Sequence, residues 1–176
     1  MSARRPGDIG RQTTQPDRRR LGFDDIEASA WVQFESAAIG LHALVNRALV
    51  QHHELSLADV QVLTHLKNHG PSPMRALAEM LRVTPSALTQ QTQRMERRRL
   101  IHRRAGSDDG RLVMASITRE GLRLTTAALE TYARLVRTHF LSQLSRNQMI
   151  ALGDGCRRIS ARLKAVDASV DSSDTQ

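Results

Sequence analysis

Apolar residues recur at helical spacing in the first long segment of the chain. Between residue 25 and about residue 52 they follow one another in three- and four-residue steps, as Trp31, Phe34, Ala38, Leu41, Val45 and Leu49. Further apolar residues broaden the stripe, so the pattern predicts a long helix that is buried over more than one face. A small domain does not cover so much apolar surface, and we therefore expect a second subunit to pack here.

Three shorter helices are predicted next, each with a recognisable start. Ser56 and Asp59 form a capping-box pattern for the first, which ends at residues 69–71, where we expect the glycine to take the left-handed conformation. Ser72 and Thr84, each followed by proline, are the predicted caps of the second and third. The connection between these last two helices is short, which is typical of a helix-turn-helix.

The helix that starts after Thr84 has two different faces. Leu88, Thr92 and Met95 fall together as a packing face, while Ser86, Gln90, Gln93 and Arg97 lie on the far side. Glutamine suits adenine and arginine suits guanine in the DNA major groove, whereas hydroxyls at the helix start suit phosphate or thymine methyl groups. An ordinary solvated helix face would hold the same residue types, so this face alone leaves that alternative open.

A basic hairpin follows this helix. Strands of about five residues flank the loop at residues 106–110, and the inward positions are Ile101, Val113, Ala115 and Ile117. Asp109 and Arg111 share one side of an extended segment, so Asp109 can hold the turn or orient an arginine while Arg111 enters the minor groove. A plain turn with a solvated arginine is the competing interpretation. The predicted DNA-binding residues are Ser86, Thr89, Gln90, Gln93, Arg94, Arg97, Asp109 and Arg111.

The last third of the chain predicts two further helices. Thr118 caps the first, whose apolar stripe is Leu122, Leu129, Val136 and Phe140. Ser145 and Gln148 form a capping box for the second, which carries a helix-packing seam made of Leu152, Cys156, Ile159, Leu163 and Val166. The predicted dimerisation residues are Trp31, Phe34, Leu41, Leu152, Ile159 and Leu163. Trp31 could instead stack on an aromatic ligand, but a tryptophan on a packed helix is more often core.

Composition and charge support this organisation. The chain has 176 residues with 40% apolar and only 3% aromatic residues, which favours a mainly α fold with a small two- to three-stranded wing. The net charge is +8, and arginines concentrate in the first twenty residues and between residues 82 and 104. Charge gathered in this way indicates a polyanionic partner, here double-stranded DNA. Expected phosphate contacts are Ser72, Arg75, Thr84, Arg99 and Arg103.

These patterns divide the chain into three parts. Residues 1–22 are expected to be a flexible basic arm, either an extra DNA contact or a disordered leader. Residues 23–166 form the domain, with dimerisation helices at about 25–52 and 118–166 around a winged helix-turn-helix at about 55–117. Residues 167–176 are expected to be a disordered polar tail. No apolar run is long enough for a membrane span and no signal core follows the basic N-terminus, so we expect a cytoplasmic protein that does not bind membranes.

The motifs resemble those of the MarR family of bacterial transcriptional regulators over about residues 30 to 165. The matching positions are Leu77-Ala78, Pro85-Ser86-Ala87-Leu88-Thr89, Leu100-Ile101, Asp109-Gly110-Arg111 and Ile117-Thr118. The resemblance implies a homodimer, joined through its first and last two helices, that binds a pseudo-palindrome as a repressor or sometimes an activator. It also implies a small phenolic or lipophilic anion as effector, bound between the dimer helices and the winged lobe. Arg99 stands where the family usually has glycine, which predicts a less sharply turned helix end, and Gly110 replaces a frequent wing arginine.

Other classes have less support in the sequence. Cys156 is the only cysteine, which excludes a disulfide framework, and its place on the apolar seam predicts a small hydrophobe rather than a redox sensor. His65 and His69 could chelate a metal, so a metal-responsive regulator stays open, but no carboxylate-histidine cluster matches the family's zinc sensors and we expect no metal or cofactor. No motif of an enzyme is present. A non-specific architectural DNA-binding protein remains a further alternative.

Overall fold

The computed structural model describes residues 22–105 and 113–173, with side chains as far as residue 166. The described residues divide into two compact units between Gly40 and Leu41, and each unit is described by itself. Outside the described ranges lie the predicted loop residues Asp109 and Arg111 and residues 1–21 of the predicted arm.

The first unit contains the start of helix α1 (Asp25–His53). Asp24 caps this helix, because its Oδ1 accepts the backbone N–H groups of Ile26 and Glu27, both at 2.8 Å. Trp31 and Phe34 lie beside each other on α1 with ring centroids 6.3 Å apart, and about half of each side chain is exposed. The expectation that Trp31 belongs to the core is therefore wrong for a single chain.

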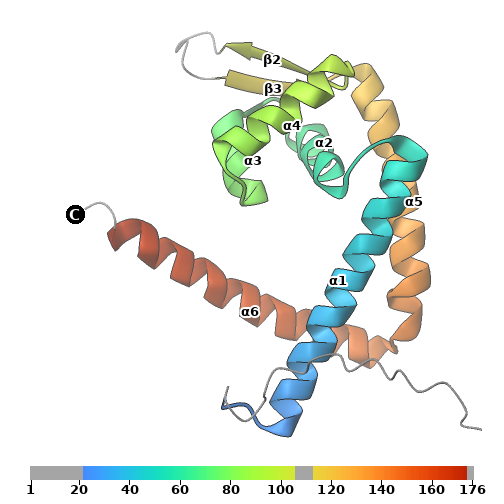
Figure 1. Ribbon diagram of the computed structural model, residues 1–176, viewed down its shortest axis with the longest axis vertical. Helices are drawn as coiled ribbons and strands as arrows, with labels where there is room; N and C mark the ends of the chain where they lie inside the picture. The colour runs from blue at the N-terminus through green and yellow to red at the C-terminus, as the bar shows by residue number, and fades with distance from the viewer. Residues whose placement is uncertain (1–21, 106–112, 174–176) are drawn as a thin grey trace, which may run out of the picture. The chain divides into compact units, whose positions relative to one another are not determined.

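The second unit contains the rest of the fold (Figure 1). After the end of α1, the elements run in the order α2 (Leu57–His69), β1 (Ser72–Pro73), α3 (Met74–Leu81), α4 (Pro85–Arg97), β2 (Ile101–Ala105), β3 (Val113–Ile117), α5 (Arg119–His139), the 3₁₀ turn η2 (Leu141–Gln143) and α6 (Arg146–Ser173). The strands form an antiparallel sheet in the order β1-β3-β2. The mainly α fold with a small three-stranded sheet is thus confirmed.

One apolar core joins these helices to the sheet. Its largest fully buried apolar side chains come from the last part of α1 and the connection to α2, from α2, α3 and α4, and from the first residue of β2: Val45, Leu49, Leu55, Val62, Leu63, Leu66, Leu77, Leu88, Met95 and Ile101. Burying aliphatic side chains of this size stabilises a fold by about 1.5 to 3 kcal/mol each. The core therefore fixes α4 against α2 and α3 and leaves its other side free.

Local capping signals gave the correct start for most helices. Ser56 and Asp59 form the predicted capping box of α2, and Thr84 and Thr118 cap α4 and α5 by accepting backbone N–H groups. Gly70 ends α2 with φ 77° and ψ −162°, a positive-φ conformation that glycine favours but not the left-handed helical one that was expected.

The prediction that Ser72 caps α3 is wrong. Ser72 lies in β1 and pairs with Ala115, so its backbone is held by the sheet, and its hydroxyl donates to the Gly70 carbonyl at 3.1 Å. Pro73 stands at the N-cap of α3 and supplies no side-chain hydrogen bond there. Ser72 is also buried, which leaves it no surface for the phosphate contact expected from the sequence.

Three further expectations need correction. Val113 is 38% exposed, because β3 begins there at the edge of the described hairpin, whereas Ala115 is buried as predicted. On α5 the buried face is made by small residues, among them Gly121, Thr125 and Ala128, while Leu122 of the predicted stripe is exposed. Helix α6 runs to Ser173, beyond the expected boundary at residue 166, and no proline or glycine interrupts that segment.

Candidate DNA-binding surface

The turn before α4 is built from local backbone geometry. Helix α3 ends at Arg82 in the left-handed conformation, with φ 54° and ψ 44°. Thr84 then caps α4, since its Oγ1 accepts the N–H of Ala87 at 3.3 Å, and Pro85 takes the first helical position. The Oγ atoms of Thr84 and Ser86 lie 3.1 Å apart, so two exposed hydroxyls stand at the start of α4.

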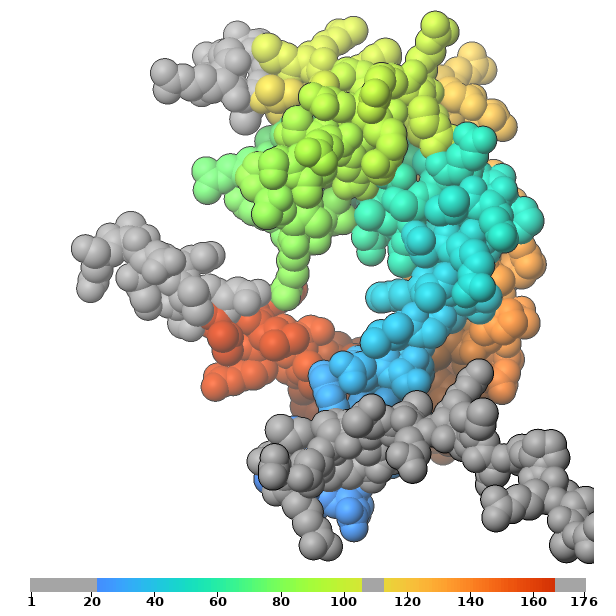
Figure 2. All heavy atoms as spheres, viewed as in Figure 1, coloured from blue at the N-terminus to red at the C-terminus, as the bar shows by residue number. Residues whose placement is uncertain are grey.

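The two faces of α4 agree with the sequence pattern. Leu88, Thr92 and Met95 are buried, and the exposed side chains include Ser86, Gln90, Gln93, Arg94 and Arg97. Thr89 is half-buried and donates its hydroxyl to the Pro85 carbonyl at 2.8 Å. Figure 2 shows the side chains of α4, in yellow-green, on the surface that faces the reader. A protruding helix with exposed amides and guanidinium groups has the chemistry needed to contact base edges in a major groove.

A buried polar network below this face was missed by the sequence analysis. Asp59 of α2 is 3% exposed, and its Oδ1 accepts from Gln91 Nε2 at 3.0 Å and from Arg94 Nη2 at 3.1 Å. The Gln91 side chain is buried beside Leu88 on the packing face. A buried amide requires a polar partner, so an amide on the packing face was the available signal for this network.

The end of α4 is a sharp turn, contrary to the expectation drawn from Arg99. The N–H of Arg99 donates to the Glu96 carbonyl at 2.8 Å, and that of Leu100 donates to the Met95 carbonyl at 3.0 Å. This is the Schellman pattern, in which the residue after the cap is left-handed, and Arg99 has φ 57°. The arginine therefore adopts the conformation that glycine usually supplies, and its exposed side chain stays available for a phosphate.

Two links hold this end of α4 to neighbouring helices. Arg98 donates to the carbonyls of His53 and Glu54 at the end of α1, and Arg98 Nη2 lies 3.3 Å from Glu54 Oε2. The Thr118 hydroxyl donates to the Arg99 carbonyl at 2.7 Å while it caps α5. The position of α4 is therefore connected directly to the ends of two long helices.

Arg103 is engaged within the protein. Its backbone N–H and its Nε both donate to the Glu96 carboxylate at 2.8 Å, and its side chain is only 21% exposed. Burial alone would raise the pKa of Glu96, but these hydrogen bonds and the Arg103 charge bring that pKa below its ordinary value. Arg103 thus fixes the hairpin to α4, and its surface for a phosphate contact is small.

The other predicted phosphate contact on α3 is accessible. Arg75 is exposed, and its Nε lies 2.9 Å from Glu79 Oε1 one turn later. An exposed pair of this kind is weak, so a phosphate could replace the carboxylate. Asp109 and Arg111 of the predicted set lie outside the described residues, and their DNA contacts stay predictions.

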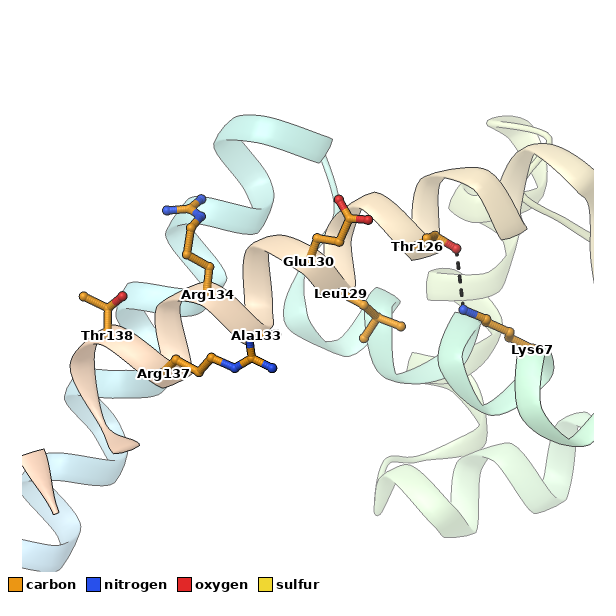
Figure 3. A pocket seen from close by; sticks show the side chains of 8 residues that line it. All are labelled: Lys67, Thr126, Leu129, Glu130, Ala133, Arg134, Arg137 and Thr138. Carbon is orange, nitrogen blue, oxygen red and sulfur yellow. Dashed lines mark hydrogen bonds between the residues drawn. The ribbon is translucent and has the colours of Figure 1, made fainter. Parts of the chain in front are cut away.

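A shallow groove lies along α2 and α5 (Figure 3). Its volume is about 630 Å³, and Lys67 Nζ lies 3.5 Å from Thr126 Oγ1 at one end. Leu129 and Arg137 project from the lower side of α5 in this view, whereas Glu130 and Arg134 point to the opposite side. The lining residues are Lys67, Thr126, Leu129, Glu130, Ala133, Arg134, Arg137 and Thr138.

A second cleft of about 520 Å³ reaches the helix-turn-helix. It is lined by residues of α1, α2, α3 and α5, among them His42, Thr64, His65, Leu81 and Tyr132. The Thr64 hydroxyl is buried and is the only such side-chain polar atom in the described part of the chain that lacks a hydrogen-bond partner. Burial lowers the pKa of His65, and the nearby His69 lowers it further, so the neutral form of the ring is favoured.

Histidine and cysteine show no metal or redox arrangement within the described residues. The rings of His65 and His69 lie 4.6 Å apart, but no group of three or more metal-ligating side chains occurs in residues 22–105 and 113–173. Cys156 is half-buried in the single chain and not fully buried as expected. No helix in these segments is long and apolar enough to cross a membrane.

Comparison with known proteins agrees with the fold. The MarR family model matches residues 55–113, which include α2, α3, α4 and β2. Over this segment the chain is similar to the MarR family. The HTH-type transcriptional repressor MdtR of Bacillus subtilis is 39% identical over 64 residues, which is 36% of this chain and 41% of MdtR. The match therefore spans less than half of that relative's length.

Solved structures extend the likeness in fold to most of the chain. AbsC from Streptomyces coelicolor has a TM-score of 0.75 at 25% identity, covering 81% of this chain and 97% of AbsC. A second regulator from that organism, solved in complex with DNA, has a TM-score of 0.75 at 22% identity, with coverage of 80% and 93%. The organohalide-sensing regulator RdhR, solved with 2,4-dichlorophenol bound, has a TM-score of 0.69 at 19% identity, with coverage of 81% and 83%. All four relatives are transcriptional regulators and not enzymes, as expected for this chain.

Proposed function

We propose that this protein is a sequence-specific DNA-binding regulator of transcription that represses its target genes as a homodimer on a pseudo-palindromic operator. The observation that carries this proposal is the exposed polar face of α4, presented by a buried apolar face on the other side of the same helix. Gln90, Gln93 and Arg97 offer paired hydrogen bonds to base edges. The solved relative in complex with DNA supports the same use of this fold.

The phosphate contacts are proposed around this helix. Exposed Thr84 and Ser86 stand at the start of α4, Arg99 at its end and Arg75 on α3, so polar groups surround the reading face. Arg111 is proposed for the minor groove. These contacts hold the protein on the duplex without reading sequence. A protein that acts on chromosomal DNA in this way works in the cytoplasm of a bacterium.

The dimer is proposed from apolar surface that the single chain leaves uncovered. The side chains of Trp31 and Phe34 on α1 are about half exposed. The side chains of Ile159 and Leu163 on α6 are also about half exposed. A second copy of the chain would bury these residues and place two α4 helices in successive major grooves, about 34 to 36 Å apart. Sedimentation equilibrium at micromolar concentration should give twice the chain mass; a stable monomer would contradict the dimer.

The second cleft is the proposed effector site. A phenolic or otherwise lipophilic anion in it would contact α2, α5 and the end of α3 at once, and its oxygen would find the Thr64 hydroxyl. The 2,4-dichlorophenol in RdhR supports this ligand class. Titration calorimetry with 2,4-dichlorophenol should show binding that Thr64→Val weakens about tenfold, the effect of losing one hydrogen bond. Equal affinity in both proteins would place the ligand elsewhere.

The DNA-reading surface is tested by a pair of matched variants. Duplexes enriched from a random pool by the purified protein provide the operator, and binding is measured by fluorescence anisotropy. Gln90→Ala should reduce the binding free energy by roughly 1 to 3 kcal/mol through one base pair and weaken the preference for that base pair. Gln51→Ala is the control: Gln51 is also an exposed glutamine, near the end of α1, and its replacement should leave DNA binding unchanged. Unchanged binding by Gln90→Ala would mean that another surface reads the DNA.

A further inference from the structure

Asp59 is buried more deeply than its capping role requires. It completes the capping box of α2, in which its Oδ2 accepts the N–H of Ser56 at 3.0 Å. A capping box works equally well at an exposed helix end, yet this residue is only 3% exposed. Burying a carboxylate is costly unless hydrogen bonds and an opposite charge compensate it. The second carboxylate oxygen, Oδ1, makes the hydrogen bonds and the ion pair that compensate this burial.

Oδ1 of Asp59 joins α2 to the reading helix α4. It accepts from Gln91 Nε2 at 3.0 Å and from Arg94 Nη2 at 3.1 Å. Gln91 is buried, but the Arg94 side chain is 54% exposed. One end of the guanidinium is thus held from below while the rest of the group reaches the face that carries Gln90 and Arg97.

We propose that Asp59 is a positioning residue that increases DNA sequence discrimination by holding the Arg94 guanidinium in one orientation and compensating its charge. This inference rests on the proposed DNA-binding function. A guanidinium held in place can recognise a guanine edge with two hydrogen bonds. A mobile arginine without a carboxylate partner is attracted to any phosphate and adds sequence-independent affinity. Asp59 therefore lowers binding to random DNA and preserves binding to the operator.

The salt dependence of binding separates this role from a purely structural one. Each uncompensated cation that meets a phosphate contributes about 0.9 to the slope of log affinity against log salt concentration. Arg97 lies nearly one turn beyond Arg94 on the same exposed face and is the matched comparison. Arg97→Gln should lower the slope on a random duplex by about 0.9, whereas Arg94→Gln should lower it much less, because Asp59 already compensates that charge.

Removing the carboxylate charge should have the opposite effect. Asp59→Asn should raise the slope on the random duplex by up to about 0.9 and its affinity about eightfold at 0.1 M salt, so the ratio of operator to random binding falls. The double variant Asp59→Asn with Arg94→Gln should return the slope to that of Arg94→Gln alone. Anisotropy titrations of all four variants between 50 and 200 mM salt, about the range in which counterion release dominates, measure these slopes.

The outcomes are distinguishable. If Asp59 acts only through the fold, Asp59→Asn weakens binding to operator and random duplex alike, and that result would overturn the inference. Arg94→Gln leaves the capping box untouched, so it remains informative even if Asp59→Asn unfolds; a slope reduction equal to that of Arg97→Gln would also overturn the inference. If the wild-type protein binds no duplex, the proposed function itself fails. If it selects an operator and only these slopes disagree, the role of Asp59 alone fails.

Discussion

Replacing Gly121 with alanine should destabilise the protein at the junction between α4 and α5. A Cβ atom at Gly121 would lie 2.1 Å from the Leu100 carbonyl oxygen and 2.9 Å from Ile117 Cγ1, whereas real Cβ contacts are essentially never under 3.0 Å. The first neighbour is backbone and cannot rotate away. The Leu100 oxygen also accepts the Thr118 N–H at 3.0 Å and the Thr118 hydroxyl at 3.1 Å. Relieving the clash therefore stretches two hydrogen bonds.

Gly121→Ala should lower the free energy of unfolding by about 3 to 4 kcal/mol. Overpacking costs about 1 to 3 kcal/mol, and each of the two stretched hydrogen bonds contributes up to about 1 kcal/mol. Alanine's better helix propensity returns at most about 1 kcal/mol, and less in the first turn of a helix. For a chain of this length the unfolding midpoint should fall by about 10 °C.

Thermal unfolding followed by circular dichroism measures this change. Gly40→Ala is the control, because Gly40 lies in α1 with nothing within 4 Å of an added Cβ. Gly40→Ala should raise the free energy of unfolding by about 0.5 to 1 kcal/mol, so the same substitution should stabilise the protein at one position and destabilise it at the other. A Gly121→Ala protein that unfolds at or above the wild-type temperature would refute the close packing of α5 against Leu100.

Three other predictions follow from single contacts. Arg99→Gly should raise stability by about 0.5 to 1 kcal/mol in chemical denaturation, because glycine removes the left-handed strain, whereas Arg99→Ala should not; equal effects would argue against that strain. Glu96→Gln should lower the free energy of unfolding by about 1 kcal/mol at pH 7 and by less in acid. The pKa of Glu96 is lowered by its pairing with Arg103, so this pairing stabilises the fold above about pH 4, and the stabilisation is lost as the pH falls. Burial and His69 lower the pKa of His65, so below about pH 6.5 the unfolded chain binds a proton that the folded chain does not, and the free energy of unfolding should decrease as the pH falls. His65→Gln should make this decrease smaller. An unchanged pH profile in that variant would contradict the prediction.

The helices and their starts were accessible from sequence because their signals are local. Ser56 with Asp59, Thr84 before Pro85, and Thr118 each accept a backbone N–H within their own helix turn, so a few adjacent residues specify the start. The packing face of α4 followed in the same way from the spacing of Leu88 and Met95.

The features that were missed depend on residues distant in the chain. Ser72 looks like a helix cap, but pairing with Ala115 places it in a strand, and no neighbour of Ser72 indicates that. Asp59 and Arg94 stand 35 residues apart, so their contact exists only once α2 and α4 pack together. The buried face of α5 was misassigned because close packing at Gly121 favours small residues, while apolar periodicity points to the larger ones.

The central claim is that the exposed face of α4 reads DNA sequence, and a comparison of two duplexes tests it most directly. One duplex carries the sequence selected by the protein, the other the same base pairs shuffled, and both affinities are measured at the same physiological salt concentration. We expect the selected duplex to bind at least about 1,000-fold more tightly, the lower range for specific regulators. A ratio near one would contradict sequence reading and would identify a protein that coats DNA through charge alone.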